Sequence, residues 1–406
     1  MSNIKKLPLL PQQKKLVGYE LNEDSKGSQN AGIAFQLKGN VDFEKVDRCL
    51  EKLNELYDTF RMNFMTDENG ETVHKINDFR LEWIRHDMTG ADDKAVIELA
   101  EKEVQTPIDV LNNPLFEFHM YKVSDENVFL LVKASHIIID GPSFTAIYVQ
   151  LSELYNGADI VKPFMWQEFI EQETAYASSA MGKKSADYWK SQHIPQQVNR
   201  EDIEKPDYSS AEREDNRLSM AELKAIAKKN KTSIFNILLF LYNVSLAELF
   251  VRNDFAVTYT ITNRFKENMR YMVGLTTHNI PYVLENIDSK DTAQLIAETK
   301  KQLNNGFSNF IMGECAEIPL FTLSYLSETI KLPEWNGLEV IRHPFNGKQN
   351  YGDMTYTLIC SEQKDFVELV VNTDRRIYRQ EFDYMLFRTM KKKLNSIFSE
   401  DRKSVV

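Results

Sequence analysis

One short motif carries the clearest signal for chemistry in this chain: His136 and Asp140 lie four residues apart, and Gly141 follows. The motif comes after an apolar run, residues 128–134, that predicts a buried strand, and before residues 142–149, which predict a helix. A strand-to-helix turn can place an imidazole at the mouth of a cleft, where it can accept a proton from an attacking nucleophile. The alternative is that His136 is a structural residue at the end of a core strand.

The residues next to the histidine suggest supporting roles. Gly141 permits close approach of the backbone, and the N–H groups of the following helix could stabilise a developing oxyanion. Asp140 either orients His136 or braces the turn through an arginine. Ser143 lacks the G-x-S-x-G elbow of a hydrolase nucleophile, so we expect it to be an N-terminal residue of the helix.

Other kinds of chemistry find little support in the sequence. Cys315 has no histidine near it in sequence, and a buried thiol is expected. His278 lies in a polar, turn-rich segment that could line a cleft, although a structural role is favoured. The chain has no HExxH motif, EF-hand loop or carboxylate cluster, and no Walker loop or Rossmann glycine fingerprint. We therefore predict that it binds no metal and no nucleotide.

Composition limits the class of protein. The length of 406 residues predicts two domains of about 200 residues each. A net charge of -11 argues against nucleic-acid binding, which needs a basic face. Cys49, Cys315 and Cys360 are odd in number and widely spaced, which predicts reduced thiols in a cytoplasmic protein. No apolar run reaches the roughly 18–20 residues of a membrane span, and residues 234–250 predict a buried helix.

Changes in composition suggest where the chain divides. Residues 195–216 are rich in Gln, Asp and Glu and poor in large aliphatic side chains, so they are the predicted linker between a first lobe, residues 1–194, and a second lobe, residues 217–406. Both lobes mix hairpin and helix signals. We therefore expect an α+β fold whose helices pack on one side of each sheet, and not a doubly wound sheet.

Several motifs in order give the chain a family resemblance. They are Leu9-Leu-Pro-Gln-Gln13, Leu56-Tyr-Asp-Thr-Phe-Arg-Met-Asn-Phe64, Ser135 to Gly141, Asp187-Tyr-Trp-Lys190 and Val273 to Pro281. Together they resemble the condensation domains of nonribosomal peptide synthetases, within the chloramphenicol-acetyltransferase-like acyltransferases. The similarity covers nearly the whole length, and Ser135 to Gly141 matches the HHxxxDG signature of that family.

The resemblance implies a fold and roles for the motif residues. Two acetyltransferase-like lobes would form a V, with the active site in a tunnel between them. His136 matches the functional histidine, and Gly141 matches the backbone near the thioester carbonyl. Asp140 matches an aspartate that braces the motif by pairing with an arginine, for which Arg264 is the candidate.

Further positions follow from the same resemblance. Ser324 falls where polar side chains of the second lobe face the site, and Ser143 and His278 are the other candidates for lining the substrate tunnel. The chain departs from the family at two of these positions. Ser135 replaces the first histidine of the signature, which has a largely structural role, and His278 stands where the family usually has asparagine.

The function implied is amide formation from a carrier-bound acyl or aminoacyl thioester and an amine, in nonribosomal peptide or lipopeptide synthesis. The partners would be an acyl or peptidyl carrier protein, whose phosphopantetheine arm presents the substrate, and an amine acceptor that is free or carrier-bound. No bound cofactor is expected. Two alternatives remain open: an ester-forming O-acyltransferase, and a non-catalytic module that recruits a partner protein. Without an adenylation domain or a carrier site, the chain would be a free-standing enzyme or an excised domain.

Overall fold

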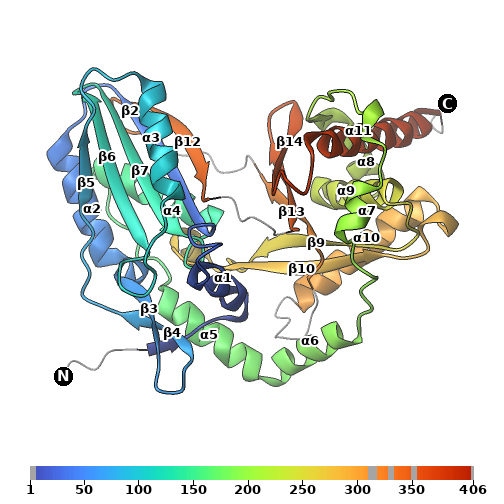
Figure 1. Ribbon diagram of the computed structural model, residues 1–406, viewed down its shortest axis with the longest axis horizontal. Helices are drawn as coiled ribbons and strands as arrows, with labels where there is room; N and C mark the ends of the chain where they lie inside the picture. Colours follow the sequence, from blue (N-terminus) through green and yellow to red (C-terminus); the bar gives the residue numbers. More distant parts are fainter. Residues whose placement is uncertain (1–5, 310–317, 328–332, 349–353, 404–406) are drawn as a thin grey trace. The chain divides into compact units, whose positions relative to one another are not determined.

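The computed structural model describes residues 6–309, 318–327, 333–348 and 354–403, so Cys315 lies outside the described residues. By its internal contacts the chain divides into two compact units, each built from three stretches of sequence (Figure 1). The first unit consists of Met1–Tyr176, Thr262–Thr277 and Leu332–Asn350. The second unit consists of Ala177–Ile261, His278–Lys331 and Tyr351–Val406.

A five-stranded sheet forms the centre of the first unit, in the order β12-β2-β7-β6-β5. Its strands are β2 (Asn30–Lys38), β5 (Trp83–Asp87), β6 (Phe116–Ser124), β7 (Asn127–Ser135) and β12 (Glu339–Asn346). Neighbouring strands run antiparallel except β5 and β6, which are parallel. The antiparallel pairing of β6 with β7 makes these two strands a hairpin, and β7 confirms the buried strand predicted over residues 128–134.

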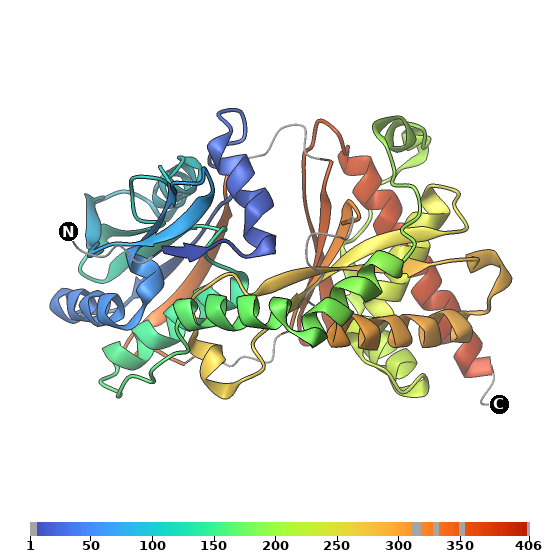
Figure 2. The same cartoon turned by 90° about the horizontal axis from the view of Figure 1, so that it is seen from below.

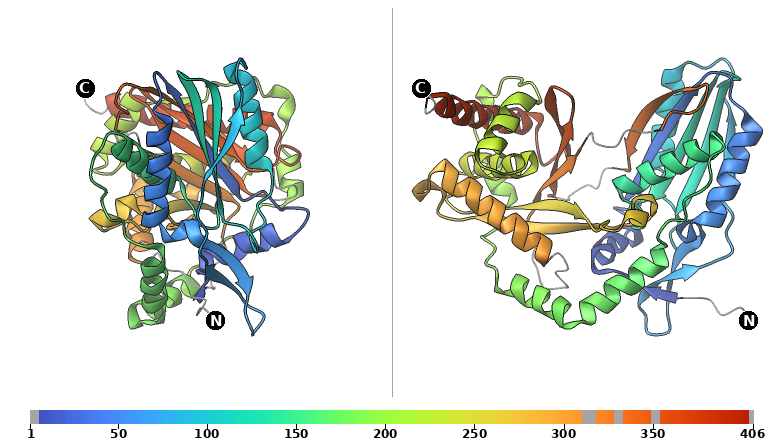
Figure 3. Two further views of the ribbon diagram at one scale, coloured as in Figure 1. Left: turned by 90° about the vertical axis from the view of Figure 1, so that its left-hand side faces the viewer. Right: turned by 180° about the vertical axis from the view of Figure 1, so that it is seen from behind.

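Alternating side chains on β7 serve two separate cores. Leu130 and Val132 face the larger core, where they pack with α2 (Phe43–Leu56) and α4 (Gly141–Tyr155). Phe129 and Leu131 face the smaller core under α3 (Asp93–Gln105). Figure 3 shows α2 and α3 on opposite sides of this sheet. The prediction of helices on one side only is therefore wrong for the first unit.

The remaining elements of the first unit include a small sheet in the order β1-β4-β3. They are β1 (Lys6–Pro8), α1 (Pro11–Leu21), η1 (Asp58–Arg61), β3 (Met62–Thr66), β4 (Thr72–Ile76), α5 (Trp166–Ser178), which runs on into the second unit, and η3 (Glu267–Tyr271). Asp58 accepts hydrogen bonds from the backbone N–H groups of Trp166 and Gln167 at the start of α5 (3.2 and 2.9 Å). This contact fixes the first turn of α5 to η1.

The second unit is built on a six-stranded sheet, in the order β10-β9-β11-β13-β14-β8. Its strands are β8 (Arg217–Ser219), β9 (Phe255–Thr262), β10 (Thr277–Leu284), β11 (Phe321–Leu326), β13 (Tyr356–Glu362) and β14 (Phe366–Thr373). Its helices are α6 (Ala180–Ser191), α7 (Arg200–Glu204), η2 (Tyr208–Ser210), α8 (Met220–Lys229), α9 (Ile234–Leu249), η4 (Ile287–Ser289), α10 (Thr292–Ser308) and α11 (Gln380–Lys403). Figure 2 shows α11 as the red helix next to the C-terminus.

The helix α9 is the centre of the second core. It is buried on all sides, since residues 236–247 are all buried, and α8, α10 and α11 pack against it. This confirms the buried helix predicted over residues 234–250. In the described part of the chain, no single helix is long and apolar enough to cross a membrane; α8 and α9 pass such a test only as a pair, bent by 101°. The α+β class predicted from the sequence is confirmed in both units.

The contacts divide the chain differently from the boundaries predicted at residues 194 and 217. Trp189 on α6 is buried in the core of the second unit, so that unit begins earlier, at Ala177. Val198 and Ile203 are buried in the same core, and α7 forms inside the predicted linker. Residues 195–216 therefore contain packed structure. The few apolar side chains of this segment are the ones that reach the core. Its average composition is therefore polar, and this is why the sequence predicted a linker.

The C-terminal end of α9 carries local backbone strain. After Phe250 the chain closes a Schellman motif, because the N–H of Arg252 donates to the carbonyl of Ala247 (2.8 Å) and the N–H of Val251 donates to that of Glu248 (3.1 Å). This motif puts Val251 at φ 52°, a left-handed conformation that disfavours a β-branched residue. The Val251 side chain is 92% exposed, so no packing offsets the strain.

We therefore expect Val251→Gly to stabilise the protein by about 1 kcal/mol, because glycine adopts this conformation without a steric cost. Thermal melting of the two proteins measures the effect. Val370→Gly is the control: Val370 is also exposed (44%) but lies in strand β14, where glycine should lower stability. A lower melting temperature for Val251→Gly would contradict the assignment of strain.

Candidate functional site

The histidine of the motif lies on the turn between β7 and α4. His136 is exposed, whereas Ile137, Ile138 and Ile139 are completely buried in the larger core of the first unit. Within the described residues, no group forms a hydrogen bond with the imidazole of His136. Three buried apolar side chains therefore anchor a turn that leaves its one imidazole open to a reactant.

Hydrogen bonds hold the backbone of this turn on both sides of the histidine. The N–H of His136 donates to the carbonyl of Gln29 (2.5 Å), and the N–H of Ile138 donates to the carbonyl of Ser135 (3.0 Å). The side-chain amide of Gln13 donates to the carbonyl of Ile137 (2.7 Å). The sequence indicated Gln13 only as part of the opening motif of the family, and no role was assigned to it.

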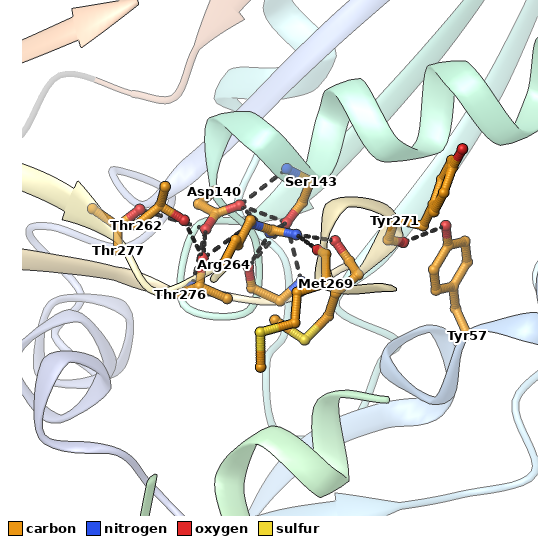
Figure 4. A network of polar contacts seen from close by, with 11 residues as sticks. Tyr57, Asp140, Ser143, Thr262, Arg264, Met269, Tyr271, Thr276 and Thr277 are labelled. Atoms are coloured by element: carbon orange, nitrogen blue, oxygen red, sulfur yellow. Dashed lines mark hydrogen bonds and ion pairs between the residues drawn. The ribbon is translucent and has the colours of Figure 1, made fainter. Parts of the chain in front are cut away.

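Asp140 is the N-cap of α4 and is almost completely buried (1% exposed). Its Oδ1 accepts hydrogen bonds from the N–H (3.0 Å) and the hydroxyl (2.6 Å) of Ser143. Its Oδ2 accepts from the N–H (3.0 Å) and the hydroxyl (2.7 Å) of Thr276. The carboxylate thus joins the start of α4 to the distant segment 262–277 of the same unit (Figure 4).

Arg264 supplies the positive charge for this carboxylate. Its Nη2 lies 2.8 Å from Oδ1 of Asp140, and its side chain is 6% exposed. Its Nη1 donates to the carbonyls of Met269 (2.9 Å) and Met272 (2.6 Å), which close the loop around η3. The ion pair predicted between Asp140 and Arg264 is confirmed. Asp140 ends the turn that carries His136, but in the described part of the chain no hydrogen bond joins Asp140 or Arg264 to the imidazole of His136.

The surroundings of Asp140 keep it ionised. Burial acts to raise the pKa of this carboxyl group, because it removes water from the charge. The Arg264 guanidinium and the hydrogen bonds from Ser143 and Thr276 more than offset burial, and the pKa is held below its usual value. Of the two roles that the sequence left open for Asp140, the geometry supports bracing of the turn, since the carboxylate oxygens are directed at Arg264, Ser143 and Thr276. We call the contacts of Asp140 with these three residues the brace.

A glycine brings the distant segment close to α5. A Cβ atom built on Gly274 would lie 2.1 Å from Cε3 of Trp166, so any side chain here would displace the indole ring. The N–H of Gly274 donates to the hydroxyl oxygen of Ser143 (3.0 Å), and the carbonyl oxygen of Gly274 lies 2.9 Å from the same hydroxyl, whose single proton goes to the closer Asp140. The absence of a side chain at Gly274 therefore permits the contact that completes the brace.

Ser143 belongs to this brace and does not line a substrate path. Its side chain is completely buried, and its hydroxyl contacts Asp140, Arg264 and Gly274. The prediction that Ser143 lines the substrate tunnel is therefore wrong. Its expected place in the first turn of α4 is confirmed.

The start of α4 leaves one backbone donor open. Pro142 has no N–H, and the N–H of Ser143 is used by Asp140. Gly141 is exposed, a Cβ atom there would meet nothing within 4 Å, and no acceptor in the described residues binds its N–H. The oxyanion donors expected from this helix therefore reduce to the N–H of Gly141, the first residue of α4, at the positive end of the helix dipole.

Ser135, in place of the family's first histidine, is the last residue of β7 and is completely buried. Among the described residues, its hydroxyl has no hydrogen-bond partner, while its backbone N–H donates to the carbonyl of Leu115 (3.0 Å). Ser135 thus contributes its backbone to the turn. Its side chain makes no polar contribution to the groups around His136.

Two predicted residues belong to the second unit. His278, in β10, is 7% exposed, and Ser324, in β11, is partly buried with its hydroxyl 2.9 Å from that of Thr260. The first unit brings together His136, Gly141, Asp140 and Arg264 with Ser135 and Ser143. Tunnel roles for His278 and Ser324 stay predictions.

In residues 6–309, 318–327, 333–348 and 354–403, no three His, Cys, Asp or Glu side chains are grouped so that they could hold a metal ion. Cys49 and Cys360 are buried free thiols, and burial raises the pKa of Cys49 to about 12. Neither thiol is suited to act as a nucleophile.

The brace generates a stability prediction. Arg264→Ala should lower the free energy of unfolding by about 3–5 kcal/mol, because it leaves the Asp140 carboxylate buried without its cation. Arg85→Ala is the control, since Arg85 pairs with Asp47 at the surface (side chains 51% and 41% exposed) and should cost under about 1 kcal/mol. Denaturant unfolding of both variants makes the comparison. Equal losses would show that Arg264 does not carry the brace.

Asp140→Asn gives a second test, through pH. A carboxyl group whose folded pKa is lowered stabilises the folded state above its unfolded pKa, near the ordinary value of 3.8, and this contribution is lost as the pH falls through the folded pKa. Asn does not titrate there. The gap in melting temperature between the natural protein and Asp140→Asn should therefore be constant near neutral pH and should narrow below about pH 4. A gap that stays constant to the lowest measurable pH would contradict an ionised Asp140.

Comparisons with known sequences and solved structures point to one protein family. A model of the condensation domain family matches residues 3–313 of this chain. Among curated relatives, surfactin synthase subunit 1 of Bacillus subtilis (strain 168) is 22% identical over 401 residues, covering 92% of this chain and 11% of that protein. Bacitracin synthase 1 of Bacillus licheniformis is 23% identical over 317 residues, covering 74% of this chain and 6% of that protein. The chain thus spans about a tenth or less of the length of these relatives.

Solved structures share the fold at low sequence identity. The condensation domain from monacolin K polyketide synthase MokA aligns with a TM-score of 0.79 and 16% identity, covering 98% of this chain and 97% of that one. A variant of the starter condensation domain of rhizomide synthetase, solved in complex with C8-CoA, aligns with a TM-score of 0.76 and 14% identity, covering 97% and 94%. Since the family model matches most of the chain and the fold agrees, this protein belongs to the condensation domain family.

Proposed function

We propose that this chain transfers an acyl or aminoacyl group from a carrier-bound thioester to an amine and so forms an amide. The observation that carries the proposal is the exposed imidazole of His136, on a turn whose backbone is fixed on both sides and which leads to the open N–H of Gly141. Membership of the condensation domain family supports this reaction class. The rhizomide starter domain, solved with the acyl thioester C8-CoA, supports a thioester as the donor.

The proposed reaction accounts for each bond and for the proton of the amine. His136 accepts or orients the proton of the attacking amine, while the amine nitrogen bonds to the thioester carbonyl carbon. The N–H of Gly141 can donate to the oxyanion of the tetrahedral intermediate. When that intermediate collapses, the C–S bond breaks, and the proton passes to the leaving thiolate, so the products are an amide and a thiol. Holding the two reactants together supplies most of the acceleration, on the order of 7–11 kcal/mol in favourable cases.

The proposed partners follow from this chemistry. The donor would be presented on the phosphopantetheine arm of an acyl or peptidyl carrier protein, and the amine would be free or carried in the same way. No metal or nucleotide is required, because the thioester is already activated. An alcohol can replace the amine, since the same base serves O–H and N–H nucleophiles; this keeps ester formation as an alternative.

The buried Ser135 hydroxyl, in place of the first histidine, favours a second candidate: a module without catalytic activity that binds a partner protein. Against it stand the retained His136 and the complete brace of Asp140 and Arg264. A chain that had lost the reaction would have no need to keep an open imidazole on a fixed turn. We therefore place catalysis first.

The test supplies purified protein with an acylated carrier protein and a panel of amines and alcohols. The natural protein should release amide, and His136→Ala should lower the rate by about 10²–10⁴-fold, because general-base catalysis is lost. His193→Ala, which removes an exposed histidine of the second unit, is the control and should keep full activity.

Each result separates the candidates. Equal product from His136→Ala would refute the role of His136, and product from alcohols alone would establish ester formation. No product from any acceptor, together with tight binding of a carrier or another protein, would establish the non-catalytic module.

A further inference from the structure

Helix α1 reaches the turn of His136 from two sides through completely or almost completely buried polar side chains. Gln13, in its first turn, is 0% exposed, and its amide donates to the carbonyl of Ile137, the residue after the histidine. Glu20, in its last turn, is 1% exposed, and its carboxylate accepts from the N–H of Gln29 (2.8 Å). The carbonyl of Gln29 in turn accepts from the N–H of His136. The carbonyl of Ile137 and, through Gln29, the N–H of His136 are thus both connected to α1 by hydrogen bonds.

The hydrogen bonds around Gln13 fix the orientation of its amide. The N–H of Leu10 donates to Oε1 of Gln13 (2.9 Å), and the carbonyl of Ile137 accepts from Nε2. If the amide were reversed, a donor would face a donor and an acceptor would face an acceptor. Oε1 must therefore point toward Leu10 and the NH₂ group toward the turn.

His74 completes this arrangement from strand β4. Its Nε2 lies 3.1 Å from Oε1 of Gln13, and because that oxygen accepts, Nε2 must carry the proton. The ring is completely buried, which lowers its pKa to about 3, so it stays neutral. Among the described residues, Nδ1 of His74 has no partner, as expected for the nitrogen without a proton in this tautomer.

We propose that Gln13, held in one orientation by Leu10 and by the neutral Nε2–H form of His74, is a positioning residue that sets the turn carrying His136. Gln13 acts through the backbone and does not contact a reactant. Its donor, 2.7 Å from the carbonyl of Ile137, determines how the peptide next to the histidine is oriented, and with it the direction of the imidazole. This inference deepens the proposed function, and its activity readout depends on it.

The decisive substitution is Gln13→Glu, which keeps the shape of the side chain. One carboxyl oxygen still accepts from Leu10 and His74, but the other can donate to Ile137 only when protonated. Among the described residues, the titratable side chain within hydrogen-bond distance of this position is His74, which is neutral. Relative to the natural protein at the same pH, we expect turnover to fall by about 10²-fold where the carboxyl is ionised, chiefly in kcat, and we expect this ratio to recover toward lower pH. Gln13→Met removes the donor and should lose activity at every pH.

Two further variants separate positioning from stability. His74→Phe keeps the aromatic packing against Phe64 and should give a smaller loss than Gln13→Met, because Leu10 still orients the amide. Asn54→Asp is the matched control. Asn54 is a buried amide of the same unit that donates to the carbonyl of Leu81 (2.8 Å) and accepts from its N–H (2.9 Å), away from the turn. It should lose stability without a new pH dependence of turnover.

A second readout does not depend on turnover. The ring signals of His136 are observed by NMR in protein with labelled histidine and are assigned by their absence in His136→Ala. Gln13→Glu should shift these signals in a pH-dependent way, whereas Asn54→Asp should leave them in place. If the natural protein forms no amide, the proposed function fails and the ring signals still decide the role of Gln13. Signals and pH profiles of both Gln13 variants that match those of Asn54→Asp would overturn the proposal.

Discussion

The buried ion pair of Asp140 and Arg264 is the constraint on which the site of the first unit depends. A carboxylate that loses nearly all its water is tolerated only if its charge and lone pairs are satisfied. Here one carboxylate caps helix α4, accepts from Thr276 and meets a guanidinium that also holds two carbonyls of the loop around η3. The start of α4 and the distant segment 262–277 are therefore fixed by one charge, and Gly141 takes its position from the helix that this charge caps.

The histidine of the motif is held by different means. His136 lies outside the ion-pair network, on a turn anchored by three buried isoleucines and by bonds to α1 and to Gln29. The strong electrostatics of the site thus act on the scaffold, while the imidazole stays exposed and without a partner in the described part of the chain. This division of roles agrees with the proton transfer proposed for His136, because a strong ion pair would hold a side chain in one protonation state.

Much of this arrangement was predictable from sequence, and the misses have physical reasons. The motif around His136, the strands beside it and the helix over residues 234–249 follow from local periodicity and turn signals. The pairing of Asp140 with Arg264 rested on the family resemblance, because 124 residues separate them. Ser143 was assigned to the substrate path since its type alone could not reveal that α4 directs its hydroxyl inward. The contact of Gln13 with the carbonyl of Ile137 was not predicted, because the sequence alone does not show which backbone group a single glutamine will reach.

The order of the segments in the first unit has a consequence for synthesis. Its sheet is completed by β12, which pairs with β2 along Glu339–Asn346, and its brace requires Arg264. A nascent chain that ends near residue 194 would hold β7 and α4, but it would have an open edge on β2 and an aspartate with no cation. Open sheet edges invite pairing with other chains. The first unit can therefore complete its fold only after most of the polypeptide has left the ribosome. Strand β2, made early, obtains its partner β12 only after residue 346 has been made.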